Sequence, residues 1–296
     1  VSERIFEMLR QCYQKRIAVD KIIHEKMMEL FRLYLMVGGM PEAVNTYIKT
    51  NNLKQVDEIQ KGIVRLYKKD IAKYDPDHKL YLEDIFSLIP SELNQKNKRF
   101  ILKNLNENFK FSRYENSFIW LKEAGVALPV YCAAEPTSPL LLSRATNLFK
   151  LFASDVGLLA SMYSDGLQLR ILKGEKDINF GSVYENVVAQ ELQTHGFELY
   201  YYNSKKQGEL DFLIEQSGVV LPIEVKSGKG YTRHAALNNV LSTGNYAIPQ
   251  GIVLCNENVQ VVENIVYYPI YMVMFLQKEE EQEEMIYKPD FSALQE

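Results

Sequence analysis

The sequence predicts a mixed α/β protein in which helical segments precede a small sheet domain. In residues 1–77, apolar residues recur at three- and four-residue spacing, which indicates amphipathic helices. Residues 78–170 change to three short helical patterns followed by strand patterns. Residues 171–296 show the order helix, strand, strand, strand, helix, strand. We therefore expect three regions with these boundaries.

The first region reads as a series of helices. Residues 3–13, 22–35 and 56–74 carry apolar side chains at helical spacing. A glycine pair that begins at Gly38 ends one helix, and Pro41 stands where the first turn of the next helix favours proline. We expect this region to be helical throughout.

The second region has the element order of a winged helix. Residues 79–90, 97–108 and 113–125 predict three short helices, and Gly125 ends the last one. Two strand patterns follow, at residues 126–136 and 147–155. Three helices and then a β-wing is the winged-helix order, so we expect a winged-helix domain over residues 78–170.

The third region alternates helix and strand signals. Its elements are expected in chain order at residues 180–196, 197–203, 210–215, 219–227, 233–244 and 250–256. The acidic run at residues 278–284 reads as a solvated segment.

Composition excludes several classes of protein. Hydrophobic residues make up 47% of the 296 and charged residues 24%, which is ordinary for a globular chain. The net charge of −4 means that a nucleic-acid partner would need a local basic patch. The three cysteines are far apart and form no CxxC, which argues against a disulfide framework or zinc ribbon and favours a reducing cytoplasm.

We expect no membrane partner. The longest apolar stretch, residues 265–276, is too short to span a bilayer and contains a proline. The first twenty residues are charged and amphipathic, unlike a signal peptide. The chain begins at Val1 inside a helical pattern, which suggests a fragment of a longer protein.

Two predicted strands carry acids where a plain core strand would carry valine or isoleucine. Asp211 lies in "LDFLIE" and Glu224 in "VVLPIEVKS", with Lys226 two residues further on. A tight turn at "QSG" would pair the two strands as a hairpin and bring the acids together. Buried carboxylates are normally paired, hydrogen-bonded or bound to a metal. Two interpretations follow: an ordinary ion pair of Glu224 with Lys226 at a sheet edge, or a metal site.

The metal interpretation predicts a defined chemistry. Two carboxylates suit Mg²⁺, which takes oxygen ligands and keeps several waters. A lysine beside the metal can orient or deprotonate a water, or neutralise charge on a phosphate. Two such carboxylates and a lysine, as at Asp211, Glu224 and Lys226, are the parts that metal-assisted phosphodiester hydrolysis needs.

The pattern D-x12-E-x-K within the order α-β-β-β-α-β resembles the PD-(D/E)XK nuclease superfamily. The resemblance implies a Mg²⁺-dependent nuclease-like domain in which Asp211 and Glu224 are metal ligands and Lys226 is the catalytic lysine. It adds Glu185, on the preceding helix, as a further acid of the site. It also implies the Val225 carbonyl as a ligand. This chain departs from the pattern at Leu210, which stands in place of the proline.

A wider resemblance covers nearly the whole chain. The segments "LFRLYLMVGGMPEAV", "YKKDIAKY", "FKLFASDVGLL", "GSVYENVVAQEL" and "GELDFLI…LPIEVKSG" are similar to the domain of unknown function that follows an AAA-type ATPase core in bacterial and archaeal proteins. The resemblance implies a preceding ATPase core, of which residues 1–77 would be the tail. ATP would bind in that preceding core and not in this chain. The stretch "SGKGYT" is not a P-loop, because Ile223 stands where the first P-loop glycine should be and Gly230 follows Lys229 in place of Ser or Thr. We therefore expect no ATPase activity from this chain alone.

Candidate nucleic-acid contacts come from two basic stretches. Lys229, Arg233 and His234 follow the strand that carries Lys226, and Lys98 and Arg99 precede the expected recognition helix. That helix itself mixes acidic and basic side chains, which suits phosphate binding poorly. DNA binding, docking of a partner protein and a purely structural role therefore stay open for the winged helix.

Two functions follow from the sequence. The first is a Mg²⁺-dependent nuclease site coupled to the ATPase core. The second is a non-catalytic module of the same fold that binds DNA or a partner protein.

Overall fold

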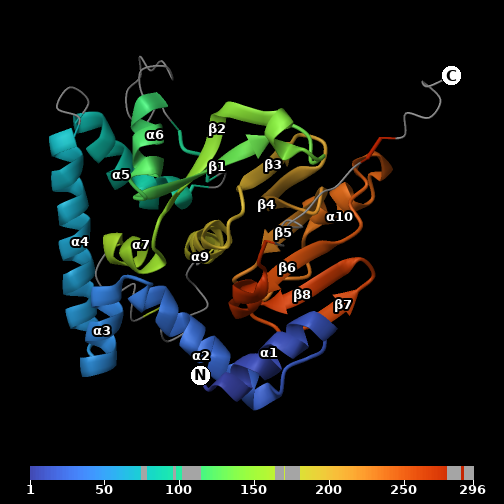
Figure 1. The fold of residues 1–296 in the computed structure, drawn as a ribbon, viewed down its shortest axis with the longest axis horizontal. Helices are drawn as coiled ribbons and strands as arrows, with labels where there is room; N and C mark the ends of the chain where they lie inside the picture. The colour runs from blue at the N-terminus through green and yellow to red at the C-terminus, as the bar shows by residue number, and fades with distance from the viewer. Residues whose placement is uncertain are drawn as a thin grey trace.

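The computed structural model describes residues 1–74, 79–95, 98–101, 115–163, 170, 181–278 and 288–289. Over these residues the protein is a mixed α/β structure in which N-terminal helices pack beside a mixed sheet (Figure 1). The acidic segment at 278–284 lies almost wholly outside the described residues.

The helical part follows the predicted order. Its helices are α1 (Glu3–Lys15), α2 (Lys21–Val37), α3 (Pro41–Thr50), α4 (Leu53–Tyr74), α5 (Lys79–Leu93) and α6 (Glu115–Glu123). Helix α2 ends at Gly38, whose φ of 65° places it in the left-handed region that glycine adopts without strain. Helix α3 then begins with Pro41, as predicted.

The described strands form one eight-stranded sheet in the order β2-β1-β3-β4-β5-β6-β8-β7. They are β1 (Ala127–Ala133), β2 (Arg144–Ala153), β3 (Tyr200–Ser204), β4 (Gly208–Gln216), β5 (Val219–Val225), β6 (Gly251–Cys255), β7 (Gln260–Val262) and β8 (Ile265–Pro269). Strand β6 is parallel to β5 and β8, whereas β3, β4 and β5 form an antiparallel meander.

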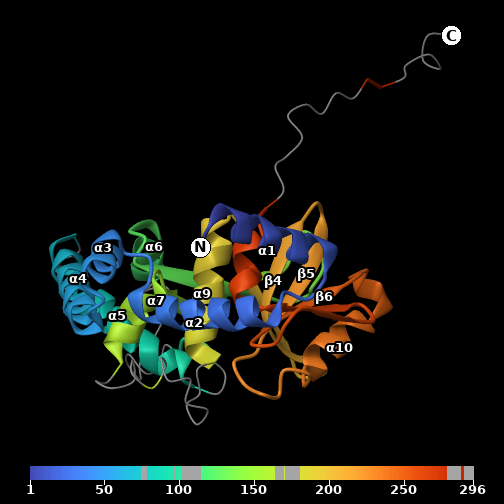
Figure 2. The same ribbon diagram turned by 90° about the horizontal axis from the view of Figure 1, so that it is seen from below.

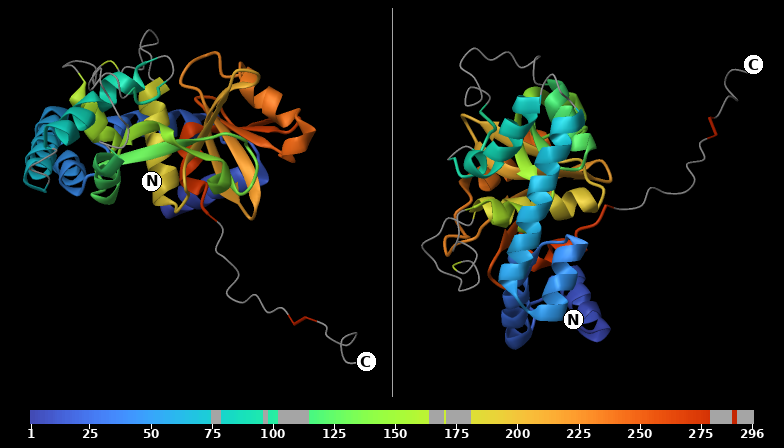
Figure 3. Two further views of the ribbon diagram at one scale, coloured as in Figure 1. Left: turned by 90° about the horizontal axis from the view of Figure 1, so that it is seen from above. Right: turned by 90° about the vertical axis from the view of Figure 1, so that its left-hand side faces the viewer.

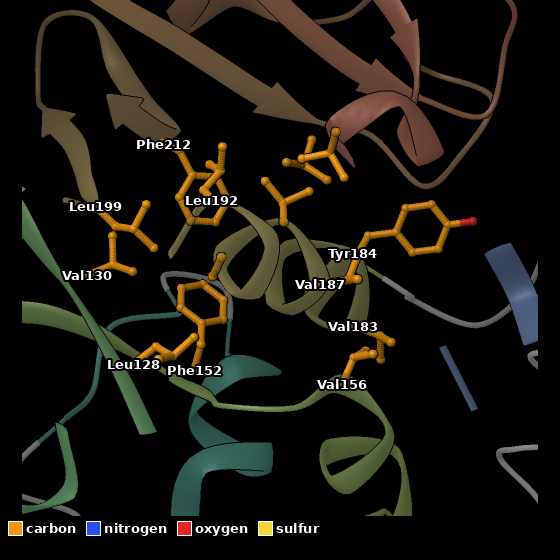
Figure 4. Close-up of a cluster of buried hydrophobic side chains, with 14 of the residues drawn as sticks. Leu128, Val130, Phe152, Val156, Val183, Tyr184, Val187, Leu192, Leu199 and Phe212 are labelled. Carbon is orange, nitrogen blue, oxygen red and sulfur yellow. The ribbon is translucent and has the colours of Figure 1, made fainter. Parts of the chain in front are cut away.

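Helices α9 (Gly181–Thr194) and α10 (Ala235–Leu241) lie on opposite faces of this sheet. The remaining elements are α7 (Val156–Met162) and the 3-10 turns Leu140–Ser143, Gly244–Tyr246 and Ile270–Phe275. Phe212 of β4 belongs to the same apolar cluster as α9, and Leu213 belongs to that of α10. Figure 4 shows Val187 and Leu192 of α9 in one cluster with Phe152 and Phe212. The central position of α9 explains why most of it is buried.

The hairpin predicted as the wing of a separate domain belongs instead to the main sheet. Strands β1 and β2 pair antiparallel, and β1 also pairs parallel with β3, with Tyr131 opposite Tyr200. Strand β1 is buried along most of its length, so both of its edges need backbone partners. Of the expected helix at 97–108, residues 98–101 are not helical and the others lie outside the described residues.

The N-terminal helices reach both ends of the molecule. Helix α1 lies against the last strands, where the Tyr268 hydroxyl donates to the Tyr13 carbonyl over 3.0 Å. Helix α2 then runs across to the α3–α4 pair (Figure 2). Figure 3 shows α4 at one end of the molecule and the sheet with α10 at the other. Residues 1–74 are thus packed onto both ends of the fold.

Candidate active site

The two acids lie at one end of the β4–β5 hairpin. Ser217 and Gly218 form its turn with φ values of 51° and 76°, which suit a two-residue hairpin turn. The register places Phe212 opposite Ile223, so the next residues along are Asp211 and Glu224. The Val225 amide donates to Asp211 Oδ2 over 2.9 Å, which fixes this carboxylate beside the end of β5.

The structure brings the four predicted site residues together. Glu224 is 6% exposed, and its Oε1 lies 2.6 Å from Lys226 Nζ. Glu185 reaches the same place from the buried helix α9 and is 2% exposed. Glu185, Asp211 and Lys226 line a pocket of about 290 Å³, which also includes Lys98 and the glycines Gly228 and Gly230.

Lys150 and Glu209 also join this cluster, and sequence reasoning missed both. Lys150 lies in β2, is fully buried, and has its Nζ 2.8 Å from Glu209 Oε1. The same ammonium lies 3.7 Å from Glu185 Oε2 and 4.0 Å from Asp211 Oδ1. A signal existed, because Lys150 interrupts the apolar strand "NLFKLFAS" just as the acids interrupt theirs.

Lys98 is also part of the charged cluster. It was expected as a nucleic-acid contact, and its Nζ forms an ion pair with Glu185 Oε1. The Phe100 amide donates to the Phe149 carbonyl over 3.0 Å, which holds the segment of Lys98 beside β2. Lys98 still lines the pocket, with its side chain 19% exposed.

The other predicted nucleic-acid contacts are divided between surface and interior. Lys229 and Arg233 are exposed on the loop that follows Lys226. Arg99 is half-buried. His234 is buried, and its ring nitrogens lie 2.6 Å from the Tyr267 hydroxyl and 3.0 Å from Asn238 Oδ1. His234 is therefore not brought to the pocket, because its polar atoms are engaged elsewhere.

Burial and repulsion between neighbouring carboxylates raise the pKa values of Glu185 and Glu224. Burial, reinforced by the charge of Asp211, raises the pKa of Glu185 to about 7 even though Lys150 and Lys98 oppose the shift. The same two causes raise the pKa of Glu224 to about 8 against the effect of Lys226. Burial alone would lower the pKa of Lys150, but the carboxylates of Glu185, Asp211 and Glu209 outweigh it and hold this pKa above its ordinary value.

The donor set is suitable for a hard cation. Glu224 Oε2 and Glu185 Oε2 are buried and have no hydrogen-bond partner among the described residues. A buried carboxylate oxygen without a hydrogen bond is unfavourable unless a cation or a proton reaches it, as the Lys150 ammonium reaches Glu185 Oε2 at 3.7 Å. In the described part of the chain, no group of three or more His, Cys, Asp or Glu residues is arranged so that it could hold a metal ion by itself. Asp211 and Glu224 are the residues that could supply two oxygen ligands to Mg²⁺, with water for the remainder.

Two family models match this chain, and both describe domains of unknown function. Residues 28–170 match DUF8612, and residues 180–273 match DUF4143. Two lysines of the cluster, Lys98 and Lys150, lie in the first range. The other members lie in the second range: Glu185, Glu209, Asp211, Glu224 and Lys226. No match is found among curated proteins or among solved structures. Among the described helices, none has the length and apolar character that a membrane crossing requires.

Proposed function

We propose that this chain carries a Mg²⁺-dependent, nuclease-like phosphodiesterase site and acts as the C-terminal region of an AAA-type ATPase. The observation that carries the proposal is a pocket lined by Glu185, Asp211 and Lys226. Glu224 is ion-paired with Lys226 behind this wall, and its second carboxylate oxygen is buried without a hydrogen-bond partner among the described residues. Strongly perturbed acids in a pocket are typical of functional sites.

The arrangement of elements supports a PD-(D/E)XK-like fold for the C-terminal part. The order α9-β3-β4-β5-α10-β6 is the predicted one, and β5 and β6 run parallel beside the β3–β4–β5 meander. The winged-helix interpretation of residues 78–170 stays a prediction: α5, α6, β1 and β2 follow one another in the predicted order, but β1 pairs with β3 of the main sheet. The place of β1 in the sheet gives that region a part in building the site.

The roles of the side chains follow from their positions. Asp211 and Glu224 would hold Mg²⁺, which when bound activates a water and withdraws charge from a phosphate. The Val225 amide keeps the Asp211 carboxylate in place for this task. Lys226 lies beside Glu224 at the pocket wall, where its ammonium can orient the water and stabilise charge that develops on the phosphate oxygens.

The charges of the cluster suit a phosphodiester. Four carboxylates (Glu185, Glu209, Asp211 and Glu224) meet three lysines (Lys98, Lys150 and Lys226). When all are ionised, one negative charge remains. With a divalent cation in place the cluster has one net positive charge, which complements the single negative charge of a phosphodiester. Lys229 and Arg233 on the adjacent exposed loop extend this positive field toward a nucleic-acid backbone.

A cleavage assay tests the proposal. The full-length protein is incubated with supercoiled, linear and single-stranded DNA, with Mg²⁺, Mn²⁺ or EDTA, and with or without ATP. We expect cation-dependent cleavage that falls by about 100-fold or more in Lys226→Ala, because Lys226 acts on charge that develops in the transition state. Asp211→Asn should also abolish cleavage by removing a metal ligand.

The matched control is Lys61→Ala. Lys61 forms an ion pair with Asp57 within α4, away from the pocket, at 2.8 Å. This variant should cleave as the wild type does. Cleavage that persists in EDTA, or that survives Asp211→Asn, would contradict the proposal.

A second candidate is a non-catalytic module that binds DNA or a partner protein for the ATPase core. The observation in its favour is that lysines already occupy the carboxylates, with Lys226 on Glu224 and Lys98 on Glu185. In that case the cluster is a buried ion-pair network. Lys226→Ala would then leave Glu224 as an uncompensated charge and cost about 3 kcal/mol of stability.

Thermal melts distinguish the two candidates. A melting temperature that Mg²⁺ does not change, together with strong destabilisation by Lys226→Ala, supports the binding module. Stabilisation of the wild type by Mg²⁺, with mild effects of Lys226→Ala on folding, supports the nuclease-like site.

A further inference from the structure

Lys150 occupies an unusual position for a lysine. Its side chain has no exposed surface, and the residue lies in a strand between the buried apolar residues Phe149 and Leu151. An isolated ammonium at such a depth is strongly unfavourable, so its neighbours must compensate the charge. Three carboxylates do so, at 2.8 Å for Glu209, 3.7 Å for Glu185 and 4.0 Å for Asp211.

The other two lysines of the cluster are placed differently. Lys98 and Lys226 line the pocket and are 19% and 26% exposed, so a ligand that enters the pocket can reach them. Lys150 does not line the pocket. It lies behind the carboxylates with its ammonium over the ring of Tyr201, at 5.0 Å from the ring centre. Neither solvent nor a ligand in the pocket can therefore contact the Lys150 ammonium, and its charge stays within the cluster.

The origin of Lys150 is also informative. It comes from β2, in the residues that match one family model, and its three carboxylate partners come from the residues that match the other. Strand β2 reaches the site because β1 pairs with β3. The hairpin that looks like a wing in the sequence thus supplies a charge to the interior of the acidic cluster.

We propose that Lys150 is a positioning residue of the site, a built-in counter-charge that acts through Glu185, Glu209 and Asp211 and sets how strongly the site attracts a divalent cation. The inference rests on the proposed function, because it assumes that Asp211 takes part in cation binding. Lys150 holds the acids together while no cation is bound, and it opposes the cation once it arrives because both carry positive charge.

The test is calorimetric titration of the full chain with Mn²⁺ at fixed pH and ionic strength. Lys150→Met removes one positive charge at similar length, so we expect Mn²⁺ to bind roughly threefold more tightly or better. Glu209→Gln removes one negative charge from a residue outside the pocket wall, so binding should weaken by a similar factor. The double variant should return to near the wild-type affinity because the two changes cancel.

This sign pattern separates an electrostatic role from a structural one. A mere loss of packing would weaken Mn²⁺ binding in Lys150→Met, and that result, or no change, overturns the inference. Should Lys150→Met fail to fold, Glu209→Gln alone decides, since unchanged affinity in that variant also overturns it. Lys61→Met on α4 is the matched control and should bind Mn²⁺ as the wild type does.

The same titration keeps the two proposals apart. If the wild type binds no Mn²⁺, both the proposed function and this inference fail. If the wild type binds Mn²⁺ and the variants at Lys150 and Glu209 do not differ from it, the proposed function stands and only this inference fails.

Discussion

Glu224 has one oxygen paired with Lys226 and one buried oxygen without a hydrogen-bond partner among the described residues. Burial and the charge of Asp211 raise its pKa from an ordinary 4.5 to about 8, and Glu185 follows with a pKa of about 7. A carboxyl group whose pKa is higher in the folded chain binds more protons when folded, over the pH range between the two values. The metal-free protein should therefore lose stability as the pH rises from about 4.5 to about 8.

The pH dependence of stabilisation by Mg²⁺ tests this reasoning. A cation on the carboxylates competes with the protons, so the rise in melting temperature caused by Mg²⁺ should be larger at pH 8.5 than at pH 6. The measurement is a series of thermal melts with Mg²⁺ or EDTA across that range. Glu224→Gln should flatten the dependence, because the amide does not titrate. An Mg²⁺ effect that is equal at both pH values would show that these acids do not hold the cation.

The sequence analysis placed Asp211, Glu224 and Lys226 close together, but it did not include Lys150 or Glu209 in the site. Asp211, Glu224 and Lys226 lie on one hairpin, so their spacing and strand phase suffice to bring them together. Lys150 and Lys98 approach from other parts of the chain, through the pairing of β1 with β3 and the Phe100–Phe149 hydrogen bond. Such long-range placement leaves no periodic signal in a single sequence.

At the scale of elements, the short helix α7 connects the sheet to the N-terminal helices. Asp155 caps α7 by accepting from the Leu158 amide over 2.8 Å, and its other oxygen accepts from the Gly39 amide over 2.6 Å. Gly157 packs directly on this junction. A Cβ at Gly157 would lie 2.8 Å from the Gly38 nitrogen and 2.5 Å from Gln60 Nε2. This close contact explains the glycines at Gly38 and Gly157, because a Cβ at Gly38 would likewise lie 2.3 Å from Asp155 Oδ1.

Two glycine-to-alanine substitutions in helices should have opposite effects. Gly157→Ala places a methyl group against the backbone of Gly38 and should destabilise the protein by about 1–3 kcal/mol. Gly62→Ala in α4 meets no atom closer than 3.9 Å and should stabilise by about 0.5–1 kcal/mol, as alanine does in a helix. Denaturant unfolding of both variants measures the difference. Equal effects of the two substitutions would contradict the close packing of α7 on Gly38.

The sequence predicted most elements but not how they associate. Helices α1 to α4 and the order from α9 to β6 follow from apolar periodicity and from Gly and Pro signals. The β1–β2 pattern reads the same in a wing and in a sheet, because a strand pattern contains no information about its distant partner. Strands β7 and β8 were missed because β8 lies in a continuous apolar run and β7 has only three exposed residues.

The whole molecule is built around one sheet to which distant parts of the chain contribute. Strands β1 and β2 precede α9 and form one end of the sheet, and β6, β8 and β7 form the other. Helix α1 packs at the β8 end, although it begins the chain. A boundary between independently folding domains would need few contacts across it, and the β1–β3 pairing places a backbone ladder there instead.

This architecture predicts that the helical part and the sheet unfold together. The three cysteines are buried and free, with Cys12 in α1, Cys132 in β1 and Cys255 in β6. If one sheet unites the chain, all three thiols should become reactive at the same urea concentration, because a single cooperative transition exposes them.

Pulsed thiol labelling, read by mass spectrometry, measures each site separately. The fluorescence of the single tryptophan, Trp120 in α6, provides an independent probe that should change with the same midpoint. Fully unfolded protein in high urea is the control for complete labelling. Labelling of Cys132 together with the Trp120 change at clearly lower urea than Cys255 would show instead that the hairpin and the helices form a separate domain, and the sheet would then have to be divided between β1 and β3.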